Sequence, residues 1–346
     1  MQSKGELIHT HTFTRDLTPS FATTLLKRIL PSLNATLITE PTNEHVGLIK
    51  FANGRRTFYR DTIFGINPVG SCETAIDKYA TAFFLKYFGY NSTECYRFAR
   101  KAEVQLYNTD SLIDSAYHVA ETMGFPVMLK PNTFSEGRLV TKVFCRDDFI
   151  SVAKKILQVT DTFLVERFYS GNDYRLVIFD GNLVAAYHRQ PLSVTGNGSK
   201  NIQSLLMERQ DIFSASGMGL VIDAYDYRIQ LTLRRLGMDL DTVLPLDKKI
   251  FLLDNANLST GGTSHDVTNH VHPDYAKLAA SICSDMALRL CGVDIITENI
   301  AEPRSDYVII EINSAPGLRH FASMSTNNTQ AVENLYRTIL YALEHG

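Results

Sequence analysis

Near the end of the chain, a carboxylate and an amide lie two residues apart, at Glu311 and Asn313, inside a run of β-branched residues. Side chains on a strand alternate between its two faces, so these two groups point to the same side. A second strand-like run, residues 292–296, adds the carboxylate of Asp294. Carboxylate and carbonyl oxygens displayed together are ligands that Mg²⁺ takes. The spacing therefore indicates a divalent-cation site, and the alternative is two ordinary strand ends with polar residues.

A lysine ends another apolar run, residues 126–130, and a polar loop at 132–138 follows it. An ammonium group that is desolvated without an anionic partner is costly, so Lys130 needs one. A phosphate oxygen would serve, and the loop, with its single glycine at Gly137, could fold over it with backbone N–H groups. The alternative is an ordinary strand end, because lysines end strands in many proteins that bind no phosphate.

Two further segments could contact a nucleotide. The apolar run 162–165 leads into Glu166, and a later strand carries Asp173 and Arg175 on one face. A base could hydrogen-bond the backbone of such a segment while Asp173 takes the ribose hydroxyls. A surface salt bridge from Asp173 or Glu166 to a neighbouring arginine explains the same residues equally well, and the sequence leaves both interpretations open.

The loop 257–264 is the richest in small polar residues. Its glycines, Gly261 and Gly262, would let the backbone approach a ligand closely, and the alternative is a plain flexible turn. The chain contains no G-x-G-x-x-G between a strand and a helix and no P-loop, so a Rossmann or P-loop nucleotide site is not expected.

In this order the segments resemble the motifs of the ATP-grasp carboxylate–amine ligases. The likeness is strongest to the ATP-grasp part of cyanophycin synthetases, with glutathione synthetases and ribosomal-protein glutamate ligases as more distant relatives. It runs from about residue 72 to the end of the chain. The stretches that carry it are Asp77-Lys78, Met128-Leu129-Lys130-Pro131, residues 165–175, residues 256–263 and residues 311–319.

The resemblance implies a role for each matched residue. Those implied to bind ATP are Lys78 and Lys130 at the phosphates, Glu166, Arg167 and Phe168 at the adenine, Asp173 at the ribose, and Gly137, Asn257, Gly261 and Gly262 in the loops. Those implied to face the phosphates, the acyl group or the carboxylate substrate are Arg175, Arg189 and Arg319. Those implied to ligate two Mg²⁺ ions, which Mn²⁺ could replace, are Asp294, Glu311 and Asn313.

The implied reaction is ATP- and Mg²⁺-dependent formation of an amide between a small carboxylate, such as an amino acid or peptide, and an amine, through an acyl phosphate. We expect loops 132–138 and 258–266 to act as lids that keep water from this intermediate. The loop 134–139 has less glycine than the family usually has. The residues before Lys78 are too few for the extra N-terminal domain of a cyanophycin synthetase and no Mur-ligase-like domain follows, so polymer synthesis is not expected. The alternatives are a non-catalytic ATP-binding regulatory protein and a kinase with a non-carboxylate acceptor.

The expected fold class is α/β (α+β), with an ATP-grasp fold in which two α+β subdomains grip ATP. The expected divisions are an N-terminal α/β cap at 1–70, a first subdomain at 71–165 and a second at 166–346. Periodicity predicts helices at 77–89, 111–123, 147–159 and 273–290 and from about 328. It also predicts a β-hairpin, 174–179 and 183–187, joined by Asp180-Gly181. Residues 201–250 are expected to be mostly helical, with no assigned chemistry and with a surface that could support a homodimer.

The composition is that of a folded globular protein, with 346 residues, 45% of them hydrophobic and 21% charged. A net charge of −3 argues against a broad nucleic-acid surface. The sequence contains no apolar run of about 18 residues, so no membrane span is predicted. The five cysteines form no Cys-x-x-Cys pair, which favours a reducing, cytoplasmic setting. His9 and His11 alternate with threonines, and a polar edge strand is favoured there over a metal site.

Overall fold

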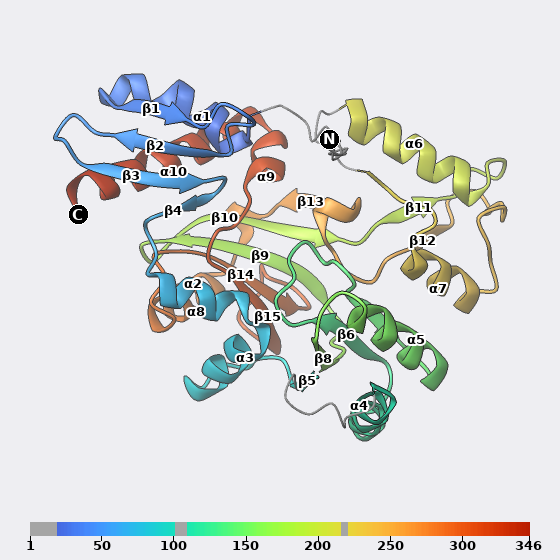
Figure 1. The fold of residues 1–346 in the computed structure, drawn as a ribbon. Coiled ribbons are helices and arrows are strands. Elements are labelled where there is room, and N and C mark those ends of the chain that lie inside the picture. The colour runs from blue at the N-terminus through green and yellow to red at the C-terminus, as the bar shows by residue number, and fades with distance from the viewer. Residues whose placement is uncertain (1–18, 101–108, 216–220) are drawn as a thin grey trace, which may run out of the picture. The chain divides into compact units, whose positions relative to one another are not determined.

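The structure is a computed structural model in which residues 19–100, 109–215 and 221–346 are described (Figure 1). It divides into two compact units, one formed by residues 1–66 with 336–346 and the other by residues 67–335. The predicted strand at His9 and His11 lies outside the described residues. Among the helices that are described, none combines the length and apolar content needed to cross a bilayer.

The first unit is built on an antiparallel sheet. Its strands, in the order β1-β2-β3-β4, span Thr36–Thr39, Val46–Lys50, Arg56–Arg60 and Ile63–Phe64. Its helical elements are α1 (Phe21–Ile29), the 3₁₀ helix η1 (Leu30–Leu33) and the end of α10 (Thr326–His345). Ser20 begins α1 by accepting a hydrogen bond from the Thr23 backbone N–H. The rings of Phe64 and Tyr336 pack edge to face at 5.3 Å in the core of this unit.

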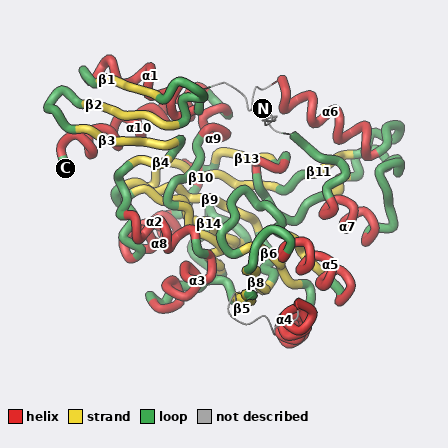
Figure 2. The backbone as a smooth tube through the Cα atoms, in the orientation of Figure 1, coloured by secondary structure: helices red, strands yellow, loops and turns green. Residues whose placement is uncertain are grey.

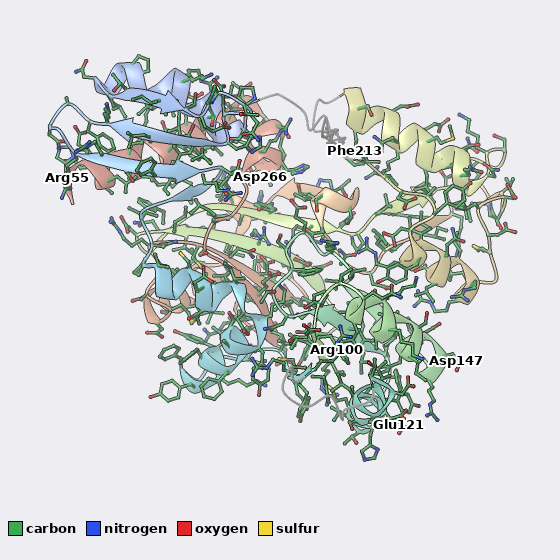
Figure 3. The ribbon with its side chains drawn as sticks, in the orientation of Figure 1. Arg55, Arg100, Glu121, Asp147, Phe213 and Asp266 are labelled. Atoms are coloured by element: carbon green, nitrogen blue, oxygen red, sulfur yellow. The ribbon has the colours of Figure 1, made fainter. Side chains whose placement is uncertain are left out.

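The second unit contains a four-stranded antiparallel sheet. Its strands, in the order β5-β8-β6-β7, span Cys95–Ala99, Thr162–Arg167, Val127–Pro131 and Thr141–Val143. Helices α4 (Thr109–Met123) and α5 (Arg146–Leu157) cover one face with an apolar core that includes Leu129 and Val165. Arg100, labelled in Figure 3, lies just after β5. Its Nη2 is 2.9 Å from Oδ1 of Asp161. The other face of this sheet carries the ion pair between Lys130 and Glu166.

A five-stranded antiparallel sheet forms the second layer of this unit (Figure 2). Its strands, in the order β13-β10-β9-β14-β15, span Thr263–Asp266, Asn182–Gln190, Asn172–Phe179, Leu290–Thr297 and Tyr307–Asn313. Its apolar face packs in one core with residues of α2 (Val69–Ile76), α3 (Lys78–Tyr87) and α8 (Pro273–Asp285). Its opposite face presents the charged side chains of the candidate site.

A smaller module completes the unit. Its elements are β11 (Ser193–Thr195), α6 (Ile202–Ala215), α7 (Tyr227–Arg235) and β12 (Lys249–Phe251). They share a core that includes Leu206 and Leu233. The remaining short helices are η2 (Leu258–Thr260), η3 (Thr268–His270) and α9 (Arg319–Ser323).

Most predicted elements are confirmed, and one predicted helix end is wrong. The β9–β10 hairpin turns at Asp180 and Gly181, which both have positive φ. The helix predicted to reach residue 290 ends at Asp285, because the chain turns at Ala287, whose φ is +52°, and enters β14 at Leu290. In the segment 201–250, helices α6 and α7 occupy residues 202–215 and 227–235, and residues 236–248 contain turns and a single bridge.

Candidate active site

The polar face of the five-stranded sheet brings three predicted residues into one row. Arg175 on β9 is the direct cross-strand neighbour of Asp294 on β14, which in turn is the neighbour of Glu311 on β15. Opposed residues in antiparallel strands point to the same side of the sheet with Cβ atoms about 5 Å apart. Asn313 lies two residues after Glu311 on β15 and therefore points to the same side of the sheet. The alternation expected from the sequence therefore places these side chains on one surface.

Asp294 is held by two arginines. Arg175 donates from Nε and Nη2 to the two oxygens of Asp294, both at 2.6 Å, in a bidentate pair. Arg189 donates from Nη2 to Oδ2 of Asp294 at 2.9 Å and to Oδ1 of Asp173 at 2.6 Å. Asp294 is 3% exposed, so this charge is compensated by protein groups instead of water.

The two aspartates of this network differ in the direction of their pKa shifts. Burial would raise the pKa of Asp294, but Arg175 and Arg189 outweigh it, and the pKa is lowered. Burial, with the negative charge of Asp294 nearby, raises the pKa of Asp173, and the opposing charges of Arg189 and, less strongly, Arg175 do not reverse this. Asp294 is thus the firmly ionised member, and the two arginines are fixed around it.

The predicted phosphate-binding lysines both pair with carboxylates. Lys78, the first residue of α3, lies with Nζ 3.1 Å from Oε1 of Glu311 and donates to the Phe134 carbonyl oxygen at 2.7 Å. Lys130 lies with Nζ 2.5 Å from Oε2 of Glu166, and both side chains are 4% exposed. Burial lowers the pKa of Lys130, but Glu166 and, less strongly, Glu311 raise it above its ordinary value. Glu311 is therefore close to one cation on α3 and to another on β6.

Of the three predicted metal ligands, Glu311, Asn313 and Asp294, only two have oxygens that could bind a cation in the present arrangement. Glu311 is 27% exposed and makes its ion pair through Oε1. The Asn313 amide nitrogen is buried without a hydrogen-bond partner among the described residues, and a rotated amide would present its oxygen there. Both oxygens of Asp294 already accept hydrogen bonds from arginines. Glu311 and Asn313 fit Mg²⁺, whereas Asp294 could ligate it only if an arginine contact were replaced.

Two loops meet beside the lysines. Arg228 on α7 donates to the Gly137 carbonyl oxygen at 2.8 Å, and Ser259 donates to the Glu136 carbonyl oxygen at 3.2 Å. A Cβ atom on Gly137 would lie 2.5 Å from Nδ2 of Asn257 and still closer to Nδ2 of Asn255. The loop at 132–138 is therefore packed directly against the loop at 255–259, with glycine required at the contact.

The other predicted residues occupy separate places. Arg167 turns to Glu94, with Nε 2.8 Å from its Oε2, while a Cβ on Gly262 would lie 2.7 Å from the carbonyl oxygens of Gln190 and Asn257. Gly261 ends η2 in a left-handed conformation. Arg319 is the exposed first residue of α9.

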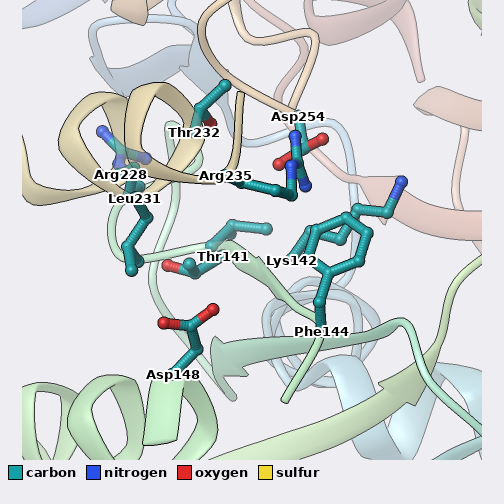
Figure 4. A pocket seen from close by; sticks show the side chains of 10 residues that line it. Thr141, Lys142, Phe144, Asp148, Arg228, Leu231, Thr232, Arg235 and Asp254 are labelled. Atoms are coloured by element: carbon teal, nitrogen blue, oxygen red, sulfur yellow. The ribbon is translucent and has the colours of Figure 1, made fainter. Parts of the chain in front are cut away.

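One polar cluster in this unit was missed from the sequence. Lys142 on β7 lies with Nζ 3.4 Å from the ring centroid of Phe168, and Arg235 on α7 stacks on Phe144 at 4.0 Å. Figure 4 shows Lys142, Phe144 and Arg235 lining a pocket together with Asp254. Burial lowers the pKa of Lys142 and raises that of Asp254. The sequence carries no signal for this cluster, because Lys142 reaches the face of Lys130 and Glu166 only through its register with Met128, which is a property of the folded sheet.

Comparisons with known proteins show which family and which fold this chain resembles. Residues 254–337 match the model of the RimK-like ATP-grasp domain. The chain is 35% identical over 227 residues to the cyanophycin synthetase of Geminocystis herdmanii, covering 62% of this chain and 25% of that protein. It is 27% identical over 218 residues to the glutathione biosynthesis bifunctional protein GshAB of Clostridium perfringens, covering 60% of this chain and 28% of that protein.

Among solved structures, the bifunctional glutathione synthetase from Pasteurella multocida superposes with a TM-score of 0.57 at 20% identity, covering 92% of this chain and 44% of that one. These matches confirm the expected fold and the expected resemblance. The chain spans about a quarter of the length of the curated relatives it matches.

Proposed function

We propose that this chain, which has the ATP-grasp fold, is an ATP- and Mg²⁺-dependent ligase that joins a carboxylic acid to an amine. The substrates are amino acids or peptides. Support comes from the relatives, which are named as cyanophycin synthetase and glutathione biosynthesis proteins. The observation that carries the proposal is the position of Glu311, which ion-pairs with Lys78 and lies close enough to Lys130 to raise its pKa.

In this proposal the triphosphate lies between the two sheets. Lys78 and Lys130 neutralise its oxygens, in place of their present carboxylate partners. Glu166 and Phe168 line the adenine, with Lys142 beside Phe168, whereas Arg167 is turned to Glu94. Mg²⁺, held by Glu311 and Asn313, would supply charge neutralisation at the phosphates. Asp294 holds Arg175 and Arg189 in orientation, and these guanidiniums face the reacting groups.

The chemistry follows from the weakness of a carboxylate as an electrophile. A carboxylate oxygen attacks the γ-phosphorus, the bond to the β-phosphate oxygen breaks, and an acyl phosphate and ADP are formed. The amine then attacks the acyl carbon, loses a proton and expels phosphate, which leaves the amide. The protein contributes alignment and fixed positive charge instead of a covalent nucleophile. Arg175, Arg189 and Arg319 are the proposed sources of that charge.

The loop contact at Gly137 gives a specific prediction. Gly137→Ala places a methyl group against Asn255 and Asn257 at a residue whose φ is +64°, so loop 132–138 cannot keep its position. We expect kcat/KM for ATP to fall by about 10- to 100-fold, because small displacements of positioning groups are costly to rate. The matched control is Gly181→Ala, whose φ is +79° with nothing within 4 Å of the added atom. Equal losses in both variants would contradict a role for the loop contact.

The function itself is tested by a screen for ADP release over pairs of amino acids and short peptides, with mass spectrometry of each hit. An amide product that forms only when acid, amine, ATP and Mg²⁺ are all present supports the ligase. A phosphate ester of a single substrate would instead identify a kinase. Saturable ATP binding with no product across the screen would favour a regulatory protein on the same fold.

A further inference from the structure

The loop at 132–138, which we expect to cover the reacting groups, has an unusual backbone conformation. Glu136, Gly137 and Leu139 have φ values of +58°, +64° and +61°. Glycine adopts this left-handed region readily, whereas glutamate and leucine are strained there by the contact of Cβ with the backbone. Two backbone hydrogen bonds within residues 135–140 are both 3.2 Å long. Contacts from outside the loop are therefore needed to keep it in this conformation.

The main chain of this loop accepts a hydrogen bond from helix α7. Arg228, the second residue of α7, donates from Nη1 to the Gly137 carbonyl oxygen at 2.8 Å. The Arg228 side chain is only 11% exposed, and a charged donor stabilises a contact more strongly where little water competes with it. Ser259 donates to the Glu136 carbonyl oxygen at 3.2 Å, a contact that is longer and involves no charge. Arg228 is therefore the stronger of these two supports.

Asp226 orients the Arg228 guanidinium. Nε of Arg228 lies 3.0 Å from Oδ1 of Asp226, and Nη2 lies 2.6 Å from Oδ2. The same carboxylate accepts a hydrogen bond from the Arg228 backbone N–H at 2.8 Å and so caps the start of α7. A guanidinium is planar, so fixing Nε and Nη2 also fixes the direction in which Nη1 donates to Gly137. Asp226 therefore directs Arg228 at the loop without the help of a ligand.

A second contact joins α7 to the strand that follows the loop. The Tyr227 hydroxyl lies 2.7 Å from Oγ1 of Thr141, the first residue of β7, and Thr141 is 4% exposed. Tyr227 and Leu231 also pack against the core of the four-stranded sheet. Figure 4 labels Thr141 and Arg228 at the pocket described above. Two adjacent residues of α7 thus contact the loop and the strand into which it leads, so α7 is anchored where it contacts the loop.

We propose that Arg228 is a positioning residue, which acts on the reaction by keeping the loop at 132–138 closed. The proposal rests on the proposed function for the ligand that the loop covers. Lys78 also contacts the loop, at the Phe134 carbonyl oxygen, but in the proposed function Lys78 binds the triphosphate instead. The Gly137 carbonyl oxygen is an acceptor, whereas a phosphate needs donors, so a nucleotide does not compete for the contact with Arg228. That contact therefore persists when the nucleotide binds.

The test is limited digestion of the full chain with trypsin, measured at the bond that follows Arg138, an exposed residue of the loop. Cleavage within a folded loop requires local opening, so its rate follows the population of the open loop. Arg228→Met should raise this rate by about 10-fold or more, because the loop loses a hydrogen bond from a charged donor. Mass spectrometry identifies the fragments 1–138 and 139–346. The matched control is Arg234→Met, which removes an exposed arginine of the same helix and should leave the rate unchanged.

A second variant separates the guanidinium contact from the stability of the helix. Asparagine caps a helix as well as aspartate does, so Asp226→Asn should preserve α7 while removing the charge that orients Arg228. Cleavage after Arg138 should rise by about threefold or more. A loss of stability alone would speed cleavage at sites throughout the chain, which the fragment pattern and circular dichroism melting would reveal. The proposal is overturned if folded Arg228→Met protein is cleaved after Arg138 at the wild-type rate, or if Arg228→Met does not fold and folded Asp226→Asn protein is cleaved at that rate.

ATP with Mg²⁺ separates this proposal from the proposed function. A ligand that binds the closed loop stabilises it, so adding both should slow cleavage after Arg138 in the wild-type chain. Cleavage that ATP and Mg²⁺ do not slow would contradict the proposed function, whereas the comparison of the variants without nucleotide would still decide the role of Arg228.

Discussion

Replacing Glu311 by glutamine is expected to lower substrate-dependent ADP release by about 10²- to 10³-fold while the protein stays folded. The variant removes one anionic ligand from the proposed cation site, and metal stabilisation of phosphoryl transfer amounts to several kcal/mol. The fold should survive because the glutamine oxygen still accepts a hydrogen bond from Lys78, and the side chain at this position is 27% exposed. Coupled-enzyme detection of ADP at saturating substrates measures the effect.

The control for this prediction is Glu302→Gln, which removes an exposed carboxylate in the turn between β14 and β15. Its ADP release should match that of the wild-type chain. A Glu311→Gln variant with unchanged turnover would remove Glu311 from the mechanism. If activity were lost together with the cooperative unfolding transition, the residue would be structural instead.

The second large effect is expected at Asp294. Asp294→Asn should lower the free energy of unfolding by about 3–5 kcal/mol at pH 7, because it leaves Arg175 and Arg189 without their shared buried carboxylate. The folded-state pKa of Asp294 is lowered from its ordinary value of 3.8. Its stabilisation is therefore present above that value and is lost as the pH falls through the lowered folded pKa. Urea unfolding at pH 7 and at decreasing pH measures the difference.

Asp173→Asn is the matched control, since Asp173 shares Arg189 but has a raised pKa. A raised carboxyl pKa means that the charged form is not favoured by folding, so stability from this group is present at low pH and is lost as the pH rises through that pKa. We therefore expect Asp173→Asn to change the free energy of unfolding at pH 7 by less than about 1 kcal/mol. Equal destabilisation by both substitutions would contradict the assignment of Asp294 as the anchor of the network.

The sequence predicts the strands of this chain better than the partners of its charged groups. Strand alternation depends on local geometry, so the common face of Glu311 and Asn313 follows from spacing alone. Cross-strand register is a tertiary property, and it alone brings Arg175 beside Asp294. For this reason the sequence leaves the salt-bridge interpretation of Asp173 open, and in the structure Asp173 does pair with an arginine, Arg189, in a buried network.

The helix predicted to end at residue 290 ends at Asp285, and the reason is again that tertiary structure decides the outcome. Met286 and Leu290 continue the apolar periodicity of α8, but Met286 belongs to the core beneath the sheet whereas Leu290, which is 4% exposed, is already the first residue of β14. An apolar spacing cannot distinguish one longer helix from a helix followed by a strand. The cluster of Lys142, Arg235 and Asp254 was missed because its members come from three elements that are far apart in the sequence.

The ion pair between Lys78 and Glu311 has a consequence for the order of ligand entry. Lys78 neutralises the carboxylate that a divalent cation would need, and Glu311 neutralises the ammonium group that a triphosphate would need. A triphosphate that takes Lys78 sets Glu311 free for a divalent cation, and a cation that takes Glu311 sets Lys78 free for the triphosphate. Each ligand thus removes a competitor of the other, and by thermodynamic linkage the enhancement is the same in both directions.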